Sequence, residues 1–450
     1  MQLHDRPEWT FAVGEGYLLP GVPMVRRLVT DLLASGIEEI VCVVGHRAEA
    51  VRGCLADLAG VRFVERRQPK GTADATLLGL EHISGSAVVI CYADIVTTAE
   101  NISRLMDEFK ASDAEGSLLV SRSLPSSTRW MAVETNSDGR VVGVVPAWDG
   151  RAPRFAGIAV LNPTTLKPYL LRNPGVMSHA PAGSMPPIEA DLSYSLDLMA
   201  QENRELTAVL AREFVVDVDK PWQIVEANVC ALNHTVNRLK ESVIEEGAIV
   251  DDSADISTDA HVYLRKGARI GKRCRIDGSV VLDQGASLVN GAILGGRNFV
   301  GRNRVCEDYC IIKRNSVIGP SCYFGHASGL EGIAFEKVSV RRAAQLCAVL
   351  GSHVNIAGGV MTGNWRFDDG VTTHLVQSHR EKPERFGEMT FLGDFVRVGN
   401  NVVFAPGAKV GSYSCIGPLI YVERDVPDRS LILKKDTVER KEWGPERYGW

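Results

Sequence analysis

Residues 270–319 read IGKRCRIDGSVVLDQGASLVNGAILGGRNFVGRNRVCEDYCIIKRNSVIG. An apolar residue recurs at every sixth position of this stretch, and a glycine often follows it. The recurring residues are Ile270, Ile276, Leu282, Leu288, Leu294, Val300, Cys306, Ile312 and Ile318. Neither a helix nor an ordinary strand has a period of six. A chain that turns through three flat faces in each coil does, because each face contributes one inward residue.

The six-residue pattern extends to both sides of this stretch. It begins near Ile244 and ends near Val422, with changes of phase on the way. Stacked coils of three hexapeptides bury one another's aliphatic ladder. Corners of such coils need small residues or residues with a positive φ, which suits the 43 glycines of the 450-residue chain. We therefore predict a left-handed parallel β-helix of hexapeptide repeats over residues 241–425, followed by a C-terminal tail at 426–450.

The repeat is interrupted between residues 362 and 391, a segment that we call the excursion. It holds Trp365, His374, His379 and a charged run at 380–385. In a solenoid an insertion leaves one face, often the binding face. A long ordered loop is usually functional, although contact with a neighbouring subunit would also explain it. The excursion is therefore a candidate binding segment.

The first half of the chain has a different pattern. Short apolar runs such as residues 40–44 and 87–92 alternate with stretches of helical spacing. This alternation predicts an α/β domain of the nucleotide-binding, Rossmann-like type over residues 1–220, with a parallel-dominated sheet covered on both faces. Residues 221–240 then predict one connecting helix, because their apolar residues form a stripe at helical spacing.

Composition excludes several classes of function. The net charge is −5 and no long basic block occurs, so neither nucleic acid nor an anionic membrane is an expected partner. No apolar run is long enough for a membrane span, and residues 1–9 lack a signal-peptide core, so we expect a cytoplasmic protein. Cys306 and Cys310 have no further metal ligands at suitable spacing, which favours buried apolar roles for both.

Several short segments carry a specific resemblance. They are residues 69–75 (PKGTADA), 92–94 (YAD), 156–158 (AGI), 216–222 (VDVDKPW) and 362–368 (TGNWRFD). Together with the predicted domain order, they resemble the bifunctional sugar-1-phosphate nucleotidylyltransferase/N-acetyltransferase family, whose best-known members are N-acetylglucosamine-1-phosphate uridylyltransferases. The resemblance covers nearly the whole chain. It implies attack by a sugar phosphate on the α-phosphorus of a nucleoside triphosphate, and acyl transfer in the second domain.

The resemblance assigns roles to particular residues. It implies Mg²⁺ ligands at Asp94 and Asp219, with Asp217 as the rival of Asp219, since Mg²⁺ prefers oxygen ligands. The implied nucleotide-binding residues are Gly14, Gly16, Arg66, Gln68, Lys70, Gly71 and Thr72. The implied substrate-binding residues are Gly157, Asn364 and Asp368. Acetyl-CoA or another acyl-CoA is the implied donor for the second domain.

The sequence also departs from the family. The loop at residues 14–21 is short and contains no arginine or lysine, although such cations stabilise the charge on a triphosphate. Arg66, Arg67 or Lys70 would have to replace them. In the second domain the position of the family's catalytic histidine falls near Arg341, and arginine cannot act as a base. His353, His374 and His379 are the candidate bases.

Three hypotheses follow. The first is a transferase acting on a sugar phosphate or sugar nucleotide, with an altered nucleotide loop. The second is a catalytically degenerate scaffold or regulator that binds nucleotide. The third is an acyltransferase whose first domain is purely structural. In each case we expect small-molecule ligands and a homotrimer assembled through the β-helices, because a solenoid leaves flat, partly apolar faces that closed symmetry buries.

Overall fold

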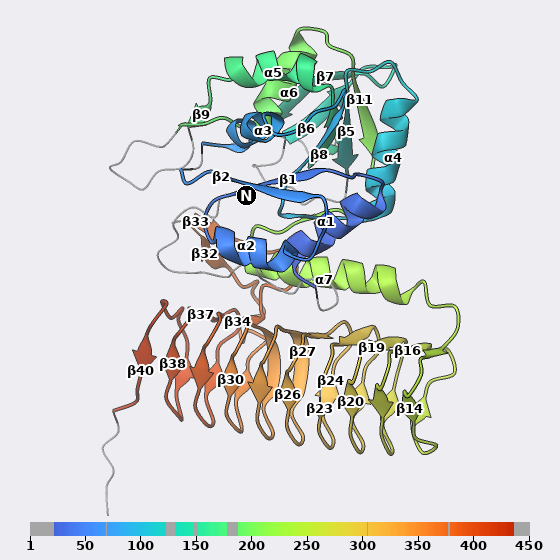
Figure 1. The fold of residues 1–450 in the computed structure, drawn as a ribbon. Helices are drawn as coiled ribbons and strands as arrows, with labels where there is room; N and C mark the ends of the chain where they lie inside the picture. The colour runs from blue at the N-terminus through green and yellow to red at the C-terminus, as the bar shows by residue number, and fades with distance from the viewer. Residues whose placement is uncertain are drawn as a thin grey trace, which may run out of the picture.

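The computed structural model describes residues 22–435, except for residue 69, residues 123–130, 147–151 and 178–187, residue 304 and residues 377–378. An α/β domain lies on one side of a long helix, and a solenoid of stacked coils lies on the other (Figure 1). No helix among these residues is long and apolar enough to cross a membrane.

The first domain alternates helices and strands, as the sequence predicts. Its helices are α1 (Met24–Ala34), α2 (Ala48–Leu55), α3 (Thr72–Leu80), α4 (Ala99–Lys110), α5 (Pro163–Arg172) and α6 (Leu192–Gln201). Its strands are β1 (Ile40–Val44), β2 (Val61–Glu65), β3 (Val88–Cys91), β4 (Ile95–Val96), β5 (Gly116–Ser121), β6 (Met131–Thr135), β7 (Val141–Pro146), β8 (Arg154–Leu161), β9 (Val176–Met177), β10 (Ile188–Glu189), β11 (Leu206–Leu210) and β12 (Val216–Asp217).

The main sheet has the order β11-β5-β8-β6-β7, with β3 also paired to β8. The prediction of a parallel-dominated sheet is wrong for these strands. β11 and β5 are parallel, but β8 is antiparallel to both β5 and β3, and β6 is antiparallel to β7. The reason is local: β6 and β7 are joined by a tight turn at residues 136–140, so no crossover helix separates them.

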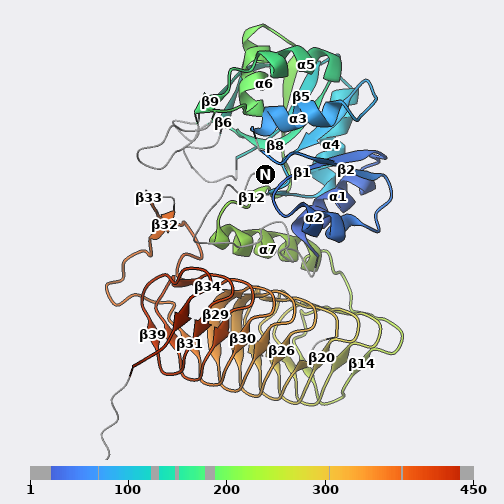
Figure 2. The ribbon, with the colours of Figure 1, turned by 60° about the vertical axis from the view of Figure 1, so that its left-hand side comes forward.

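The second domain is the predicted left-handed β-helix (Figures 1 and 2). Strands of one face are β14 (Ile249–Val250), β17 (Arg269–Ile270), β20 (Ser287–Leu288), β23 (Val305–Cys306), β26 (Tyr323–Phe324), β28 (Ser339–Val340), β30 (Asn355–Ile356), β35 (Arg397–Val398), β38 (Cys415–Ile416) and β40 (Leu431–Ile432). Strands of a second face are β13 (Val243–Ile244), β16 (Val262–Leu264), β19 (Val280–Leu282), β22 (Asn298–Val300), β25 (Val317–Ile318), β34 (Thr390–Leu392) and β37 (Lys409–Val410). Strands of the third are β15 (Asp255–Ile256), β18 (Arg275–Ile276), β21 (Ile293–Leu294), β24 (Ile311–Ile312), β31 (Met361–Thr362), β36 (Val403–Phe404) and β39 (Tyr421–Val422). The longer β27 (Gly329–Ala334) and β29 (Gln345–Leu350) pair with strands of both the second and third faces.

The register confirms three hexapeptides in a coil. Arg269 pairs with Ser287, which lies 18 residues further along the chain, and all pairs between successive coils are parallel. The glycines that follow the inward residues have a different role from the one expected. A Cβ at Gly271 would lie 2.6 Å from the carbonyl oxygen of Leu288 in the next coil, so close stacking requires glycine there. Positive-φ corners are instead often occupied by other residues, such as Asn303 and Tyr309.

Helix α7 (Pro221–Val236) lies between the two domains (Figure 2). Its buried residues pack against outward-facing residues of the second face of the β-helix, which are Val281, Phe299, Val317, Ile333, Val349 and Phe391. The same cluster includes Met24, Val96 and Val216 of the first domain. A single apolar core therefore joins the first domain, α7 and the β-helix, so the two domains are packed together rather than linked by a free tether.

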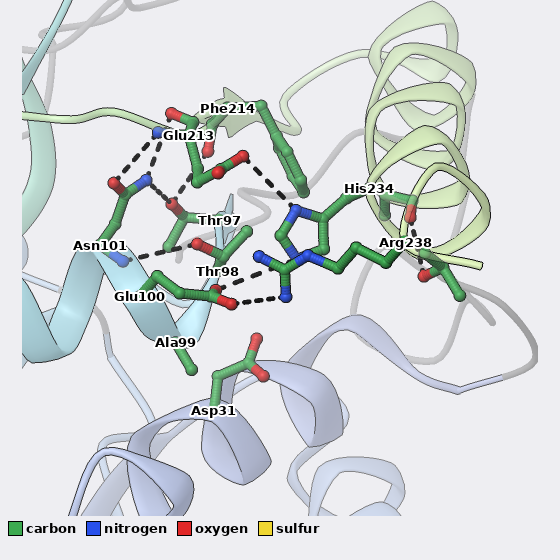
Figure 3. A network of polar contacts seen from close by, with 12 residues as sticks. Asp31, Thr97, Thr98, Ala99, Glu100, Asn101, Glu213, Phe214, His234 and Arg238 are labelled. Atoms are coloured by element: carbon green, nitrogen blue, oxygen red, sulfur yellow. Dashed lines mark hydrogen bonds and ion pairs between the residues drawn. The ribbon is translucent and has the colours of Figure 1, made fainter. Parts of the chain in front are cut away.

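The C-terminal end of α7 is fixed to the first domain by a polar network (Figure 3). Arg238 donates to Glu100 at 2.6 Å, and His234 lies 3.4 Å from Glu213. Burial is the largest single effect on the pKa of Glu100 and raises it, but the hydrogen bonds from Arg238, its own backbone and Thr98 together lower that pKa to about 2. This network and the apolar contacts fix the orientation of α7 on the first domain.

Candidate functional site

Three aspartates converge at the N-terminal end of α7. Asp94 follows the C-terminal end of β3, while Asp217 and Asp219 lie at the end of the first domain. β4 and β12 pair antiparallel with Asp217 opposite Ile95, and the Val218 amide donates to the Asp94 carbonyl at 3.0 Å. This pairing brings one carboxylate oxygen of each aspartate within 4.8 Å of the others. Sequence left Asp217 and Asp219 as alternatives, and both lie in the cluster.

The cluster has unmet electrostatic requirements. Asp94 Oδ1 is buried and has no hydrogen-bond partner among the described residues. Burial raises the pKa of Asp94, and the negative charge of Asp219 raises it further. Burial and the charges of Asp94 and Asp219 hold the pKa of Asp217 well above its usual range, although nearby Lys220 acts in the opposite direction. Oxygen-only ligands with excess negative charge are the donor set that a hard divalent cation such as Mg²⁺ takes, so the residues fit that ion.

The backbone that carries this cluster is held by the first turn of α7. The side-chain oxygen of Gln223 accepts from the amides of both Asp219 and Lys220, at 2.9 Å and 2.7 Å. Pro221 occupies the first turn, where its missing N–H costs nothing. Sequence analysis did not single out Gln223. A polar residue three positions after a helix N-cap is a capping-box signal, and that signal would have identified this residue.

The predicted loop at residues 66–72 lies beside α3. Gly71 has φ +105°, and a Cβ there would lie 2.3 Å from the Ala190 carbonyl oxygen, so glycine is required by packing against Ala190. Thr72 Oγ1 accepts from the Leu192 amide at 2.8 Å. Among the described residues, these packing and hydrogen-bond contacts are enough to explain why glycine and threonine occupy positions 71 and 72. Gly14 and Gly16 lie outside the described residues.

The candidate cations are only partly available. Arg66 forms a two-point ion pair with Asp74, with nitrogen–oxygen distances of 2.5 Å and 2.9 Å. That pairing offsets the charge that was expected to face a triphosphate. Gln68 and Lys70 have exposed side chains.

Gly157 lies close to Asp94 in space. It has φ +69°, and its carbonyl accepts from the Tyr92 amide at 2.8 Å. A Cβ at this position would lie 2.9 Å from both the Tyr92 ring and Ile95, so the Tyr92–Asp94 turn requires glycine here. The pKa of Tyr92 is raised, mainly by burial and also by the charges of Asp191 and Asp94. Gly157 therefore packs against the turn that carries Asp94.

The excursion forms a short hairpin of β32 (His374–Val376) and β33 (His379–Glu381). His374 is buried, with an exposed fraction of 2%. Its Nε2 lies 2.7 Å from the Gly387 carbonyl oxygen, which only accepts, so Nε2 donates. Nδ1 then accepts from the Lys409 ammonium at 3.2 Å. Burial and the Lys409 charge lower the pKa of His374. Both ring nitrogens are engaged, so this geometry does not suit a catalytic base.

The other candidates of the second domain lie elsewhere. His353 stacks on Phe395 with ring centroids 4.6 Å apart and lies 3.9 Å from Glu336. It lines a cleft of about 590 Å³ between the β-helix and helices α1 and α2. The side chain of His379 lies outside the described residues.

The two excursion residues assigned to the acceptor are both exposed. Asn364 is hydrogen-bonded to Cys347, whose pKa burial raises to about 12. Asp368 forms an ion pair with Arg366 at 2.6 Å. The first contact ties the excursion back to β29, and the second is internal to the excursion.

Similarity to known proteins agrees with this geometry. Residues 17–156 match the MobA-like NTP transferase domain. The chain is 26% identical over 455 residues to the bifunctional protein GlmU of Sorangium cellulosum, across 94% of this chain and 90% of that protein. The chain is thus a distant homologue of GlmU-like bifunctional nucleotidyltransferase/acetyltransferases over nearly its full length.

Two further relatives match this chain over different lengths. The bifunctional protein GlmU of Methanococcus maripaludis is 21% identical across 93% of this chain and 91% of its own length. A bifunctional sugar-1-phosphate nucleotidylyltransferase/acetyltransferase of Sulfurisphaera tokodaii is 26% identical across 53% of each chain. The resemblance inferred from short segments is therefore confirmed at the level of the family.

Proposed function

We propose that this GlmU-like chain is a transferase acting on a sugar phosphate or sugar nucleotide, and that its first domain binds a nucleoside triphosphate together with Mg²⁺. The observation that carries the proposal is the convergence of Asp94, Asp217 and Asp219 around a buried, unpartnered carboxylate oxygen. Buried carboxylates of like charge are unfavourable unless a cation or proton lies between them. A structural role alone does not account for that arrangement.

The chain's own contribution to nucleotidyl transfer is mostly positioning. A bound Mg²⁺ would neutralise charge on the triphosphate as pyrophosphate leaves. The carboxylates of Asp94, Asp217 and Asp219 would hold it. Gln223 fixes the backbone of Asp219, and the β4–β12 pairing fixes Asp94 against Val218. Gly157 lets Tyr92 and Ile95 pack closely against it, and the proposed sugar would bind beside this turn.

One observation favours the second hypothesis, a nucleotide-binding scaffold with little turnover. Arg66, the strongest replacement for the missing loop cations, is already paired with Asp74. A site with metal carboxylates but few free cations would still bind nucleotide through the metal. It would stabilise the developing charge of the transition state poorly. Binding and turnover therefore have to be measured separately.

For the second domain we propose an acyl-CoA-dependent transferase activity, with the excursion contributing to the acceptor site. Asn364 and Asp368 lie on this exposed segment, and His353 or His379 remains the candidate base. The excursion also exposes Trp365 and Phe367, with exposed fractions of 75% and 107%. Apolar side chains exposed in this way support assembly with further copies of the chain, so we propose a homotrimer, to be checked by light scattering.

Calorimetric titration of the full chain with nucleoside triphosphates tests the first domain. We expect binding in the presence of Mg²⁺ and its loss with EDTA. Asp94→Ala should weaken binding by more than the roughly 10–100-fold that loss of an outer partner costs at a metal site. Asp252→Ala, which removes an exposed carboxylate of the β-helix, is the matched control. Equal binding by wild type and Asp94→Ala would remove the cluster from the nucleotide site.

A further inference from the structure

The excursion leaves the β-helix, and its β32–β33 hairpin lies near the N-terminal end of α7 (Figure 2), where Glu381 pairs with Lys220. We infer that Glu381, a residue of the second domain, is a positioning residue for the metal site of the first domain, which it serves by holding the Lys220 ammonium away from the aspartates. This inference rests on the proposed metal and nucleotide site. It assigns to the excursion a task in the first domain that is separate from binding an acyl acceptor.

The hairpin presents two residues to the start of α7. His374 and Glu381 are directly opposite each other in the register of β32 and β33. Side chains of an opposed pair lie on the same face of a hairpin. The His374 ring lies 4.8 Å from the Trp222 ring, and Glu381 Oε1 lies 3.3 Å from Lys220 Nζ. One face of the hairpin therefore covers the first turn of α7.

Lys220 stands next to the cluster and is itself buried. It directly follows Asp219, and its positive charge acts on the pKa of Asp217. A buried ammonium needs an anionic partner. Two kinds of partner are near it: the aspartates of the cluster and Glu381. Because Lys220 pairs with Glu381, the aspartates remain available to bind a cation from solution.

Contacts with the β-helix hold the hairpin, and with it Glu381, in place beside Lys220. Lys409 bridges His374 Nδ1 and Asp425 Oδ2, with its Nζ 3.2 Å and 2.7 Å away. The Lys409 amide also donates to Asp425 Oδ1 at 3.1 Å. Gly407 permits the close approach, since a Cβ there would lie 2.5 Å from Thr372 Cγ2. The β-helix thus provides a rigid base for the hairpin.

A second contact lies further along α7. Arg385 of the excursion is close enough to Glu226 that its charge lowers the pKa of that carboxyl, although burial, the larger effect, raises it. Trp222, Glu226 and Cys230 are four residues apart and so share one face of α7. Burial raises the pKa of Cys230 to about 11, and the charge of Arg385 acts in the opposite direction. The excursion therefore follows one face of α7 over two turns.

The expected consequence of losing Glu381 is competition at the cluster. With Glu381→Gln, the Lys220 ammonium loses its anionic partner and turns to Asp217 or Asp219. A cation from solution then has to displace it. Outer partners of metal ligands typically contribute about 10–100-fold to metal affinity, so we expect a roughly 10-fold loss. Adding Lys220→Met removes the competitor, and the double variant should regain most of the lost affinity.

The experiment measures Mn²⁺ binding to metal-free full-length protein by electron paramagnetic resonance, without nucleotide. The variants are Glu381→Gln, Lys220→Met and their combination, with Glu384→Gln as a charge-matched control on the same excursion. Hydrogen exchange of residues 216–226, measured without metal, reports whether the first turn of α7 is loosened. We expect weaker Mn²⁺ binding only in Glu381→Gln, unchanged exchange of residues 216–226 in every variant, and restored Mn²⁺ affinity in the double variant.

The outcomes separate the two proposals. Wild-type protein that binds no Mn²⁺ would overturn the proposed metal site, and the inference with it. Wild-type protein that binds Mn²⁺ only as tightly as Glu381→Gln does would overturn the inference and leave the metal site standing. Weaker binding in Glu381→Gln that Lys220→Met fails to restore would show a merely structural role for Glu381, which also overturns the inference.

Discussion

Two polar clusters flank the first turn of α7, and they are built on opposite principles. Around His374 the imidazole and the Lys409 ammonium are paired: Nε2 donates to Gly387, and Lys409 donates to Nδ1 and pairs with Asp425. Around Asp94 three carboxylates face one another, and one buried oxygen has no hydrogen-bond partner in the described chain. Buried polar groups in folded proteins are normally satisfied. A satisfied cluster indicates a structural role, and an unsatisfied one indicates a missing ligand.

The largest expected effect tests whether the unsatisfied cluster suffices for catalysis. We predict that transfer from UTP to N-acetylglucosamine-1-phosphate is slower than is typical of the family by on the order of 10²–10³-fold, because each absent transition-state cation costs about that much. The motivating residues are the loop at 14–21, which has no arginine or lysine, and Arg66, which is paired with Asp74. Pyrophosphate release measures the rate. Family-typical rates would show that other cations, such as Arg67 or Lys70, serve the triphosphate.

The next effect tests the satisfied cluster. His374→Ala leaves the Gly387 carbonyl without its donor and the Lys409 ammonium without its ring-nitrogen acceptor. It also opens a gap beside the Trp222 ring. Unsatisfied buried groups of this kind cost about 1–3 kcal/mol each, so we expect a lower melting temperature. Differential scanning calorimetry checks this.

Comparison with His353→Ala, a partly exposed histidine on the β-helix, provides the control for this variant. An unchanged melting temperature in His374→Ala would contradict a structural role. It would reopen His374 as a functional residue.

The two clusters also differ in how much of each could be predicted from the sequence alone. The β-helix was predictable because each inward residue repeats at a fixed spacing, so many weak local signals agree. The proximity of Asp94 to Asp217 and Asp219 was predictable because each lies in a recognisable segment at a strand end or helix start, although the sequence left the choice between Asp217 and Asp219 open. The contacts of Glu381 with Lys220 and of His374 with Trp222 were not predictable, since nothing local in residues 374–381 indicates which distant segment they contact. Contacts between distant segments depend on how the domains pack, and a single sequence does not encode that packing in any short pattern.

The smallest expected effect is the change in folding stability caused by Asp217→Asn, and its sign is the informative part. Its pKa in the folded chain lies well above the ordinary value of 3.8, mainly because of burial and also because of Asp94 and Asp219. The folded chain therefore binds more protons than the unfolded chain, and wild-type stability falls as pH rises above about 3.8. An asparagine side chain at this position carries no charge. In EDTA at neutral pH, Asp217→Asn should thus be more stable by about 1 kcal/mol, a shift of roughly 1 °C in the melting temperature of a 450-residue chain.

The same variant should reverse its sign when metal is present. Saturating Mg²⁺ stabilises the folded wild type by mass action, and the variant, having lost a ligand, gains less. Near pH 3.5 the difference in EDTA should vanish, because Asp217 is then largely protonated in both the folded and the unfolded wild type. Melting curves at the two pH values, with EDTA or Mg²⁺ and with the exposed Asp252→Asn as control, measure all four conditions. A variant less stable than wild type in EDTA at neutral pH would mean that Asp217 is satisfied by the protein itself. The aspartate cluster would then not be unsatisfied, and the contrast drawn between the two clusters would be wrong.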